Sequence, residues 1–281
     1  MSPGRRQENG RPSRAHLSLA GGHLAYETAG QGAPILFIHS VIADSRMWGR
    51  ESTLYSAEHQ TVRYDLRGFG GSSPATAAFS NVEDIVSLLV RLRVQRPFVV
   101  GSSMGGAIAI DLALEHPEMV RGLFLVAPGL SGGFEPPFDA EEEAAFAYDD
   151  EKSQEIARTW SRGKRSAAFD LLRRLWCSAL DGPSLELFRR MVVENAAEVF
   201  DNRSMQHAAQ VPSAAGRLAT IKIPTTVLVG DRDNPSSICF AKRIASSVPG
   251  ARLITVPGAD HLVNLSCPEA FDAALRAALA G

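Results

Sequence analysis

A serine with a glycine two residues before it and another two residues after it could act as a nucleophile. Gly101, Ser103 and Gly105 form this Gly-x-Ser-x-Gly pattern between an apolar run at 97–100 and a small-residue helical pattern at 104–115. A serine at a sharp strand-to-helix turn has a strained backbone, and its neighbours two positions away must be small for strand and helix to pass. The hydroxyl then lies near a helix N-terminus, where backbone N–H groups favour developing negative charge. This setting predicts that Ser103 is a nucleophile.

A serine nucleophile needs a base, and the base needs a carboxylate to orient it. His261 lies in the loop that directly follows an apolar run at 251–256, which places it at the carboxyl end of a predicted strand, where open α/β sheets bind their ligands. We therefore predict that His261 is the base. His207 is a weaker alternative, because it lies in a segment without strand patterns, and Ser102 is a competing hydroxyl that lacks the symmetric glycines.

Two aspartates, Asp231 and Asp233, follow the predicted strand at 225–229, and either could orient the histidine. The turn after Gly230 should carry the chain back over the sheet, so the later position points inward. We therefore prefer Asp233 as the acid. The residues after the strand that ends at Val126 are neutral, which disfavours an acid on that earlier strand.

Strand-length apolar runs and helical patterns alternate over most of the chain and must position these residues. The glycines at 21 and 22 can take the positive φ that a tight hairpin requires. Between 132 and 216 the strands stop, and the segment is rich in Glu, Ala, Arg and Leu at helical spacing. The predicted strands are 16–20, 23–28, 34–38, 61–65, 97–100, 122–126, 225–229 and 251–256, and the predicted helices include 82–92, 104–115, 237–247 and 268–280.

This alternation predicts an α/β fold with a mostly parallel central sheet, helices on both faces, and a helical lid inserted before the last two strands. We expect residues 1–15 to form a flexible N-terminal tail. Residues 16–131 and 217–281 should form the core domain, and residues 132–216 the helical cap. The cap should set substrate choice, and its aromatic side chains could line an apolar pocket, although aromatics at helical spacing are more often plain core.

Composition excludes several classes of protein. The 281 residues are 45% hydrophobic and 21% charged, and 29 Lys plus Arg against 31 Asp plus Glu give a net charge of -2. Intrinsic disorder needs low hydrophobicity with high net charge, and general nucleic-acid binding needs a basic surface. We expect no nucleic-acid partner. A chain of this length buries roughly three quarters of its unfolded surface, enough for a full core.

The three cysteines, at 177, 239 and 267, show no metal-ligand spacing and no disulfide framework. Reduced thiols fit a cytoplasmic protein, and the polar first 14 residues contain no apolar core of a signal peptide. No apolar run approaches the roughly 20 residues that span a bilayer. We expect a cytoplasmic protein with no membrane partner, no metal and no cofactor.

The chain order Ser103, Asp233, His261, with the serine in a strand–turn–helix setting, resembles the α/β-hydrolase fold superfamily. Residues 65–72 are similar to the D-x-R-G-x-G-x-S loop common in that superfamily, and Pro224 and residues 258–262 also match its pattern. The resemblance covers about residues 16 to 280. Residues 39–48 and 212–218 most resemble the branch of 3-oxoadipate enol-lactonases and small esterases.

The resemblance implies a serine hydrolase that cleaves a small carboxylic ester or lactone through an acyl-enzyme intermediate, with a possible homodimer. It also implies an oxyanion hole made by the backbone N–H groups of Val41 and Met104. Many relatives have His-Gly where this chain has His39 and Ser40. Because Ser40 lacks the freedom of glycine at positive φ, the loop could follow another path, or the hydroxyl could itself donate to the oxyanion. His39 is interpreted as structural, with a direct substrate contact as the alternative.

Two other functions fit the same residues. One is a carbon–carbon bond hydrolase acting on a dianionic ring-cleavage product, which would need arginines near the serine, for example Arg46. The other is a non-catalytic ligand-binding protein, which the intact set of serine, aspartate and histidine disfavours.

Overall fold

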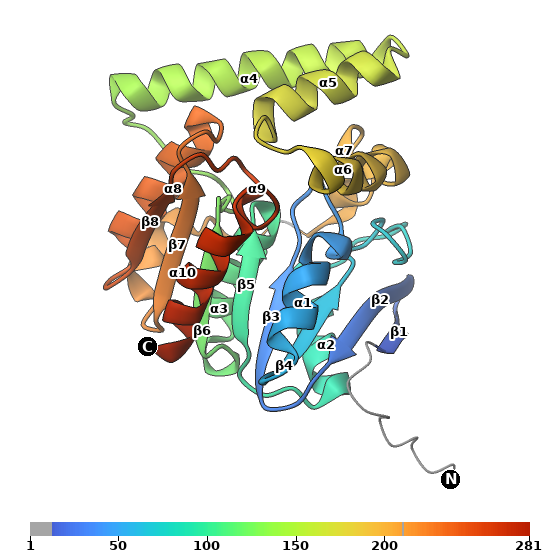
Figure 1. Cartoon of the computed structure of the whole chain (residues 1–281), viewed down its shortest axis with the longest axis vertical. Helices are drawn as coiled ribbons and strands as arrows, with labels where there is room; N and C mark the ends of the chain where they lie inside the picture. The colour runs from blue at the N-terminus through green and yellow to red at the C-terminus, as the bar shows by residue number, and fades with distance from the viewer. Residues whose placement is uncertain (1–12, 210) are drawn as a thin grey trace.

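The computed structural model describes residues 13–209 and 211–281, and eight strands in them form one sheet. The strands are β1 Ser13–Leu19, β2 Gly22–Ala29, β3 Ala33–Ile38, β4 His59–Tyr64, β5 Phe98–Ser102, β6 Gly122–Val126, β7 Thr225–Gly230 and β8 Arg252–Val256. Their order in the sheet is β1-β2-β4-β3-β5-β6-β7-β8 (Figure 1). The β1–β2 and β2–β4 pairs are antiparallel, and all pairs from β4 to β8 are parallel.

The first strand begins earlier than predicted. Ser13 pairs with Thr28 of β2, so residues 13–15 belong to the sheet and not to a tail. The start of this edge strand is hard to predict from the sequence because it is polar: Arg14 and His16 are exposed, and Leu17 and Leu19 are only half-buried. The rest of the predicted tail, residues 1–12, lies outside the described residues.

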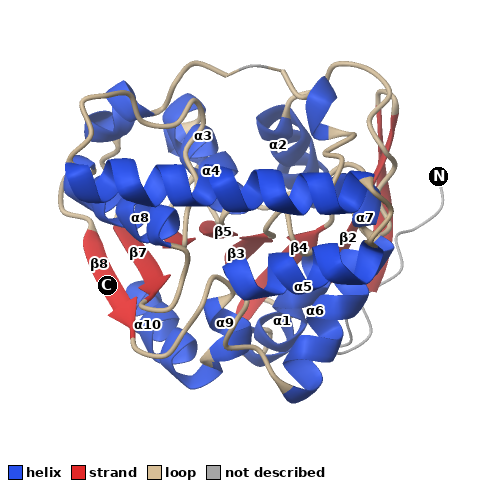
Figure 2. Ribbon diagram, turned by 90° about the horizontal axis from the view of Figure 1, so that it is seen from above, coloured by secondary structure: helices blue, strands red, loops and turns tan. Residues whose placement is uncertain are grey.

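Helices cover both faces of the sheet (Figure 2). One face carries α2 Asn81–Leu92, α3 Met104–Glu115 and α8 Pro235–Ser247, and the other carries α1 Gly49–Tyr55, α9 Val263–Ser266 and α10 Pro268–Ala280. Short 3₁₀ turns are η1 Ser45–Trp48, η2 Pro117–Met119, η3 Met205–His207 and η4 Ala215–Thr220. The predicted α/β fold is confirmed.

Strand β3 shows how the sheet separates two hydrophobic cores. Leu36 and Ile38 pack into the core on the α2 and α3 side, whereas Ile35 and Phe37 pack into the core on the α10 side. All four side chains are fully buried. Successive side chains of a strand point to opposite faces, so a strand buried on both faces is apolar throughout.

Four helices lie between β6 and β7 and cover the carboxyl ends of the parallel strands (Figures 1 and 2). They are α4 Ala140–Ser161, α5 Arg165–Trp176, α6 Gly182–Glu194 and α7 Ala196–Val199, all within the range predicted for the cap. A capping box starts α4, in which the Asp139 side chain accepts from the Glu142 N–H and the Glu142 side chain accepts from the Asp139 N–H. None of the helices in the described ranges is both long and apolar enough to cross a bilayer.

Candidate active site

Ser103 occupies the turn between β5 and α3 with a φ of 54° and a ψ of -116°. Glycine is required on both sides of this turn. A Cβ on Gly101 would collide with the carbonyl of Gly105, and a Cβ on Gly105 would collide with the carbonyl of Ile38. The Ser103 side chain makes no capping hydrogen bond to α3, which leaves its hydroxyl available for chemistry.

His261 and Asp233 meet in a buried ion pair. His261 Nδ1 lies 3.0 Å from both carboxylate oxygens of Asp233, and the side chains of the two residues are 4% and 0% exposed. Ser237 Oγ is a more distant neighbour, 3.5 Å from the same nitrogen. Asp231 instead accepts a hydrogen bond from the Gly258 N–H at 2.7 Å and is exposed. The later of the two aspartates is therefore the one that faces the histidine.

The pKa of His261 is raised above its ordinary value. Burial is the largest influence and lowers this pKa, but the negative charges of Asp233, Asp260 and Asp149 and the hydrogen bond that His261 donates to Asp233 together outweigh it. Because Nδ1 faces the Asp233 carboxylate, it carries the proton of the neutral imidazole. The Nε2 lone pair is then free to accept a proton.

Ser103 and His261 line one cavity of about 240 Å³ beneath the cap. Its remaining lining is almost entirely apolar: Val41, Ile42, Ile156, Ala157, Leu172, Trp176, Val199 and Phe200, with Ser153 as the other hydroxyl. The Trp176 ring lies 4.7 Å from the His261 ring, centroid to centroid, and the Trp176 carbonyl accepts from the His261 N–H at 3.1 Å. The cap thus forms part of the cavity and contacts the histidine directly.

An oxyanion hole requires N–H groups that are not already bonded to a backbone carbonyl, and those of Val41 and Met104 fit this requirement. Met104 is the first residue of α3, so its N–H has no partner within the helix. In the described chain neither N–H donates to a backbone carbonyl of a turn or loop. Val41 also lines the cavity that contains Ser103.

Ser40 does not have the backbone conformation that would need glycine, since it is absent from the positive-φ residues of the described chain. Its side chain is fully buried, and its Oγ accepts from the Ile42 N–H at 3.4 Å. The loop thus accommodates a serine without strain. Ser40 is also not among the lining residues of the cavity that holds Ser103 and His261, which favours a backbone role for Ser40 over donation by its hydroxyl to the oxyanion.

His39 is held by the backbone at both ring nitrogens. Its Nδ1 donates to the Ser40 carbonyl at 2.8 Å, and its Nε2 accepts from the Leu66 N–H at 2.9 Å, an arrangement that fixes a neutral tautomer. Burial lowers its pKa, against the opposing charges of Asp65 and Asp44. The contacts are those of a structural histidine.

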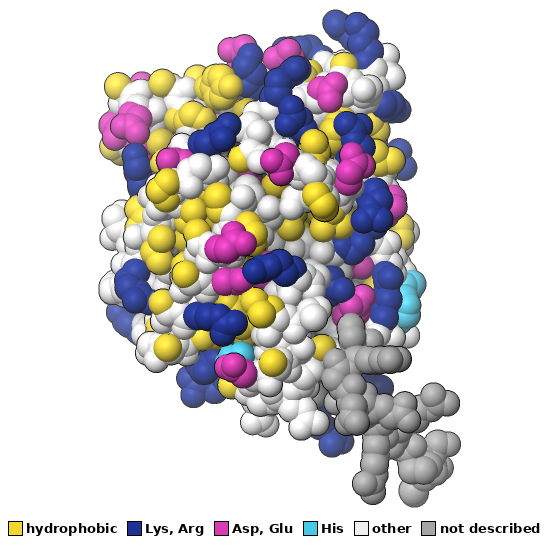
Figure 3. Space-filling model, in the orientation of Figure 1, with side chains coloured by type: hydrophobic (Ala, Val, Ile, Leu, Met, Phe, Trp, Pro, Cys, Tyr) yellow, Lys and Arg dark blue, Asp and Glu magenta, His cyan; other side chains and the backbone are white. Residues whose placement is uncertain are grey.

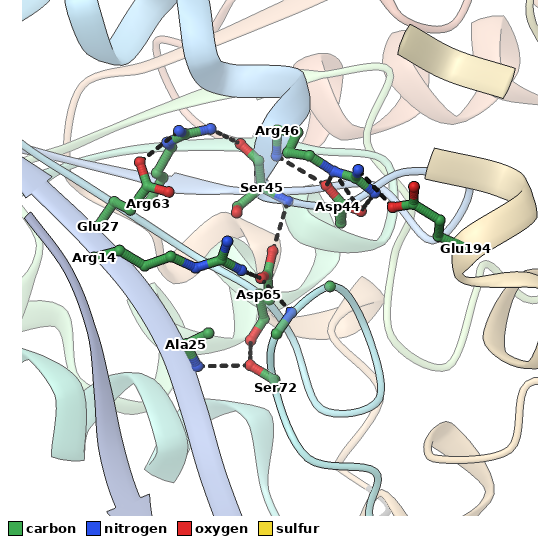
Figure 4. Close-up of polar contacts among 12 residues, drawn as sticks. Arg14, Ala25, Glu27, Asp44, Ser45, Arg46, Arg63, Asp65, Ser72 and Glu194 are labelled. Atoms are coloured by element: carbon green, nitrogen blue, oxygen red, sulfur yellow. Dashed lines mark hydrogen bonds and ion pairs between the residues drawn. The ribbon is translucent and has the colours of Figure 1, made fainter. Parts of the chain in front are cut away.

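The 65–72 loop is joined to the segment that carries Asp44 and Ser45 (Figure 4). Asp65 accepts from the backbone N–H groups of Ser45 and Gly71, each at 2.9 Å. Ser72 Oγ accepts from the Ala25 N–H at 2.9 Å and donates to the Asp65 carbonyl. The motif therefore joins β2, the loop after β4 and the start of η1.

Two polar cap residues that sequence analysis did not identify reach the site. Asp149 of α4 accepts from Asn234 Nδ2 at 2.5 Å, and the Asn234 N–H donates to Asp233 Oδ1 at 2.7 Å. Asn195 Nδ2 donates to Asp44 Oδ2 at 2.7 Å. The Asn-Pro step at 234–235 is a sequence signal that Asn234 is the N-cap residue of α8. The sequence of the cap domain gives no comparable signal for Asp149 or Asn195.

The weaker candidates lie elsewhere. Ser102 Oγ is buried without a hydrogen-bond partner, and His207 is exposed in η3 and does not line the cavity. Over residues 13–209 and 211–281, His, Cys, Asp and Glu form no group of three that could hold a metal ion.

Several known proteins are similar to this chain in sequence or in structure. Rhodomycin D methylesterase of Streptomyces peucetius is 27% identical over 272 residues, which are 87% of this chain and 90% of that protein. A 2-hydroxymuconate semialdehyde hydrolase of Pseudomonas putida is 33% identical over 138 residues, 47% of this chain and 48% of that protein. The solved structure of Est816, an N-acyl homoserine lactone degrading enzyme, has a TM-score of 0.73 and 25% identity, and covers 94% of this chain and 99% of its own.

A family model described as the alpha/beta hydrolase family matches residues 35–274, from β3 into α10. This match confirms the superfamily indicated by the sequence motifs, while the enol-lactonase and small-esterase branch stays a prediction. The chain belongs to the alpha/beta hydrolase family.

Proposed function

We propose that this protein is a serine hydrolase that cleaves an uncharged carboxylic ester or lactone through an acyl-enzyme intermediate. The observation that carries the proposal is the single apolar cavity that holds both Ser103, in its strained turn, and His261, whose Nδ1 is paired with Asp233. This arrangement fits a nucleophile, a base and the acid that orients the base.

In the proposed reaction Ser103 Oγ attacks the substrate carbonyl carbon and its proton passes to His261 Nε2. The carbonyl becomes an oxyanion, which the N–H groups of Val41 and Met104 would stabilise, each typically by about 3 kcal/mol. His261 then protonates the leaving alkoxide as the acyl–oxygen bond breaks. Water, deprotonated by His261, attacks the acyl-enzyme, and the carboxylic acid and free Ser103 are released.

The cavity favours a neutral substrate with an apolar acyl or alkyl group. None of its described lining residues is Lys or Arg, and its walls are mainly aliphatic and aromatic. Ester and lactone chemistry also matches the names of two similar proteins, the methylesterase and the lactone-degrading Est816.

Carbon–carbon bond hydrolysis is a weaker proposal, although one relative over about half the chain has that kind of name. Its dianionic substrates would need cationic groups in the cavity. Arg46, the arginine considered for this role in the sequence analysis, is held between Asp44 and Glu194, at 2.6 Å from an oxygen of each (Figure 4). A guanidinium with two carboxylate partners has little capacity to bind a third.

The proposal is tested with a panel of p-nitrophenyl esters, aliphatic lactones and homoserine lactones, comparing wild type with Ser103→Ala. We expect turnover of at least one ester or lactone and a loss of roughly 10⁴- to 10⁶-fold in the variant, because residues of such a unit act together. A fluorophosphonate should label Ser103 and leave Ser102 untouched. Full activity in Ser103→Ala would refute the nucleophile. No turnover and no labelling of the folded wild type would favour the non-catalytic alternative.

A further inference from the structure

A second cavity of about 290 Å³ lies within the cap, between the end of α4, the start of α5 and the helices α6 and α7. Its apolar walls are aromatic and aliphatic. The Trp160 and Phe200 rings stack with centroids 4.1 Å apart and an interplanar angle of 11°, and Phe169 forms a further wall. Val193 of α6 also lines this cavity and is 64% exposed.

Two arginines line the same cavity. The Arg165 guanidinium carbon lies 3.5 Å from the centroid of the Trp160 ring, and that of Arg189 lies 4.4 Å from the centroid of Phe169. Within the described ranges neither guanidinium pairs with a carboxylate, and Arg165 donates only to the Trp160 carbonyl. The nearby Asp201 carboxylate is engaged by Trp160 Nε1 at 2.8 Å.

Two core arginines, Arg46 and Arg67, are by contrast paired with Asp44 and Asp84. Figure 3 shows several Lys and Arg side chains at the upper right, near the turn between α4 and α5, with Asp and Glu side chains among them. A cavity with apolar walls and two uncompensated guanidinium groups at its rim is complementary to a molecule that has an apolar body and one anionic end.

We propose that this cavity binds a soluble amphipathic carboxylate, with its apolar body against Trp160, Phe169 and Phe200 and its carboxylate between Arg165 and Arg189. The guanidinium fork matches a carboxylate in shape as well as charge, and Ser166 adds a hydroxyl to the lining. The volume of about 290 Å³ lies just below the roughly 300 to 1,000 Å³ of small-molecule sites, which suits a small acid of about six to ten carbons.

Phe200 links this cavity to the active site, because its ring lines both. A carboxylic acid is also the class of product that the proposed hydrolase would release. The cap site would then hold an acid on the far side of Phe200 from Ser103. Binding itself does not depend on the proposed hydrolysis, so the two proposals can fail separately.

The test is calorimetric titration of the full-length Ser103→Ala variant with octanoate, which measures binding whatever the activity of the wild type. We expect one site, with a dissociation constant at least 10-fold higher after Arg165→Gln and Arg189→Gln are added together. The matched control adds Arg162→Gln and Arg190→Gln, exposed arginines next to the site that do not line it, and should change the constant by less than about 2-fold.

Four results would overturn the proposal. Octan-1-ol, which has the same chain without the charge, could bind as tightly as octanoate. Octanoate could bind equally to both double-substituted proteins, which would place it elsewhere, or fail to bind at millimolar concentration. Finally, sedimentation with phosphatidylglycerol vesicles that requires Arg165 and Arg189, without octanoate binding, would assign the basic rim to a lipid surface instead.

Discussion

Ser103 combines a strained backbone with a free hydroxyl, and its surroundings explain why the strain persists. A positive φ in a non-glycine residue costs of order 1–3 kcal/mol, and it survives only where the neighbouring structure enforces it. Here the close approach of Gly101 to Gly105, and of Gly105 to the carbonyls of Ile38 and His39, fixes the turn. Sequence spacing was sufficient to predict this residue because the geometry requires glycine at both flanking positions.

Exchanging each aspartate after β7 for asparagine should separate the two. Asp233→Asn should lower kcat for a p-nitrophenyl ester by roughly 10³- to 10⁴-fold, because an amide cannot hold the proton-bearing Nδ1 of His261 as a carboxylate does. Asp231→Asn should cost less than about 10-fold, because its Oδ1 can still accept from Gly258. The reverse order of losses would mean that Asp231 is the acid.

Asp149 contacts the acid Asp233 through Asn234 and should act as a positioning residue. Asp149→Asn keeps an oxygen for Asn234 but removes a negative charge that raises the pKa of His261. The imidazolium becomes less stable, so the pKa of His261 falls and the acidic limb of the pH profile of kcat/KM moves to lower pH. Activity above the limb should change by less than about 10-fold.

Asp150→Asn is the matched control for this pH profile, because Asp150 is the exposed neighbour that bonds to Gln154. It should leave the acidic limb in place. An unmoved limb in Asp149→Asn, or an equal movement in both variants, would show that Asp149 has no particular influence on His261.

At the scale of elements, the strands and long helices were predictable because apolar runs are bounded by glycine and proline. The predicted bounds of α3, β6 and α10 agree with the structure. Helix α1 was not predicted, since its buried face includes Glu51 and Ser52 and so breaks the apolar periodicity. Tertiary packing, not local pattern, makes this segment helical.

Glu51 gives α1 a pH-dependent contribution to stability. Burial raises the pKa of its carboxyl to about 7, with Arg50 and Asn264 opposing the shift. Between its unfolded pKa and about 7 the folded state binds the extra proton, so the free energy of unfolding falls as the pH rises through this window. The change in unfolding free energy caused by Glu51→Gln should therefore be roughly 1–3 kcal/mol more stabilising at pH 8.5 than at pH 5.

Denaturant unfolding of wild type and Glu51→Gln at the two pH values checks this expectation. Glu58→Gln, an exposed carboxylate just beyond α1, is the control and should change stability by less than about 0.5 kcal/mol at either pH. A Glu51→Gln effect that is the same at pH 5 and pH 8.5 would contradict a buried, titrating carboxyl.

At the scale of the whole molecule, the parts that sequence analysis missed are those where the cap meets the core. Asn195 and Asp149 belong to helical sequences in which a polar residue normally faces solvent. Their partners Asp44 and Asn234 lie 151 and 85 residues away. No local pattern carries such a pairing, whereas Ser103, Asp233 and His261 each follow a strand whose end the sequence marks.

Asn195 joins the cap to two loops of the core at once. It is buried, its Nδ2 donates to Asp44 Oδ2 and its Oδ1 accepts from the Gly70 N–H, both at 2.7 Å. Asp44 belongs to the loop that follows Val41, and Gly70 to the 65–72 loop. Asn195→Ala leaves the buried Asp44 carboxylate and the Gly70 N–H each short of a partner, which should cost about 1–3 kcal/mol of unfolding free energy. Amide hydrogen exchange should accelerate in α6, α7 and both loops, before the sheet.

Glu194→Gln provides the matched control, because Glu194 is the neighbouring residue, pairs with the same loop through Arg46 and is 56% exposed. Its loss should cost less than about 1 kcal/mol.

Asn195→Asp gives a second readout, since it places a second carboxylate next to that of Asp44. The two charges repel when both are ionised, so this variant should be less stable at pH 8 than at pH 5, whereas Asn195→Ala should differ little between them. Equal effects of Asn195→Ala and Glu194→Gln would mean that the cap is held by its apolar contacts alone, and that the hydrogen bonds of Asn195 only accompany them.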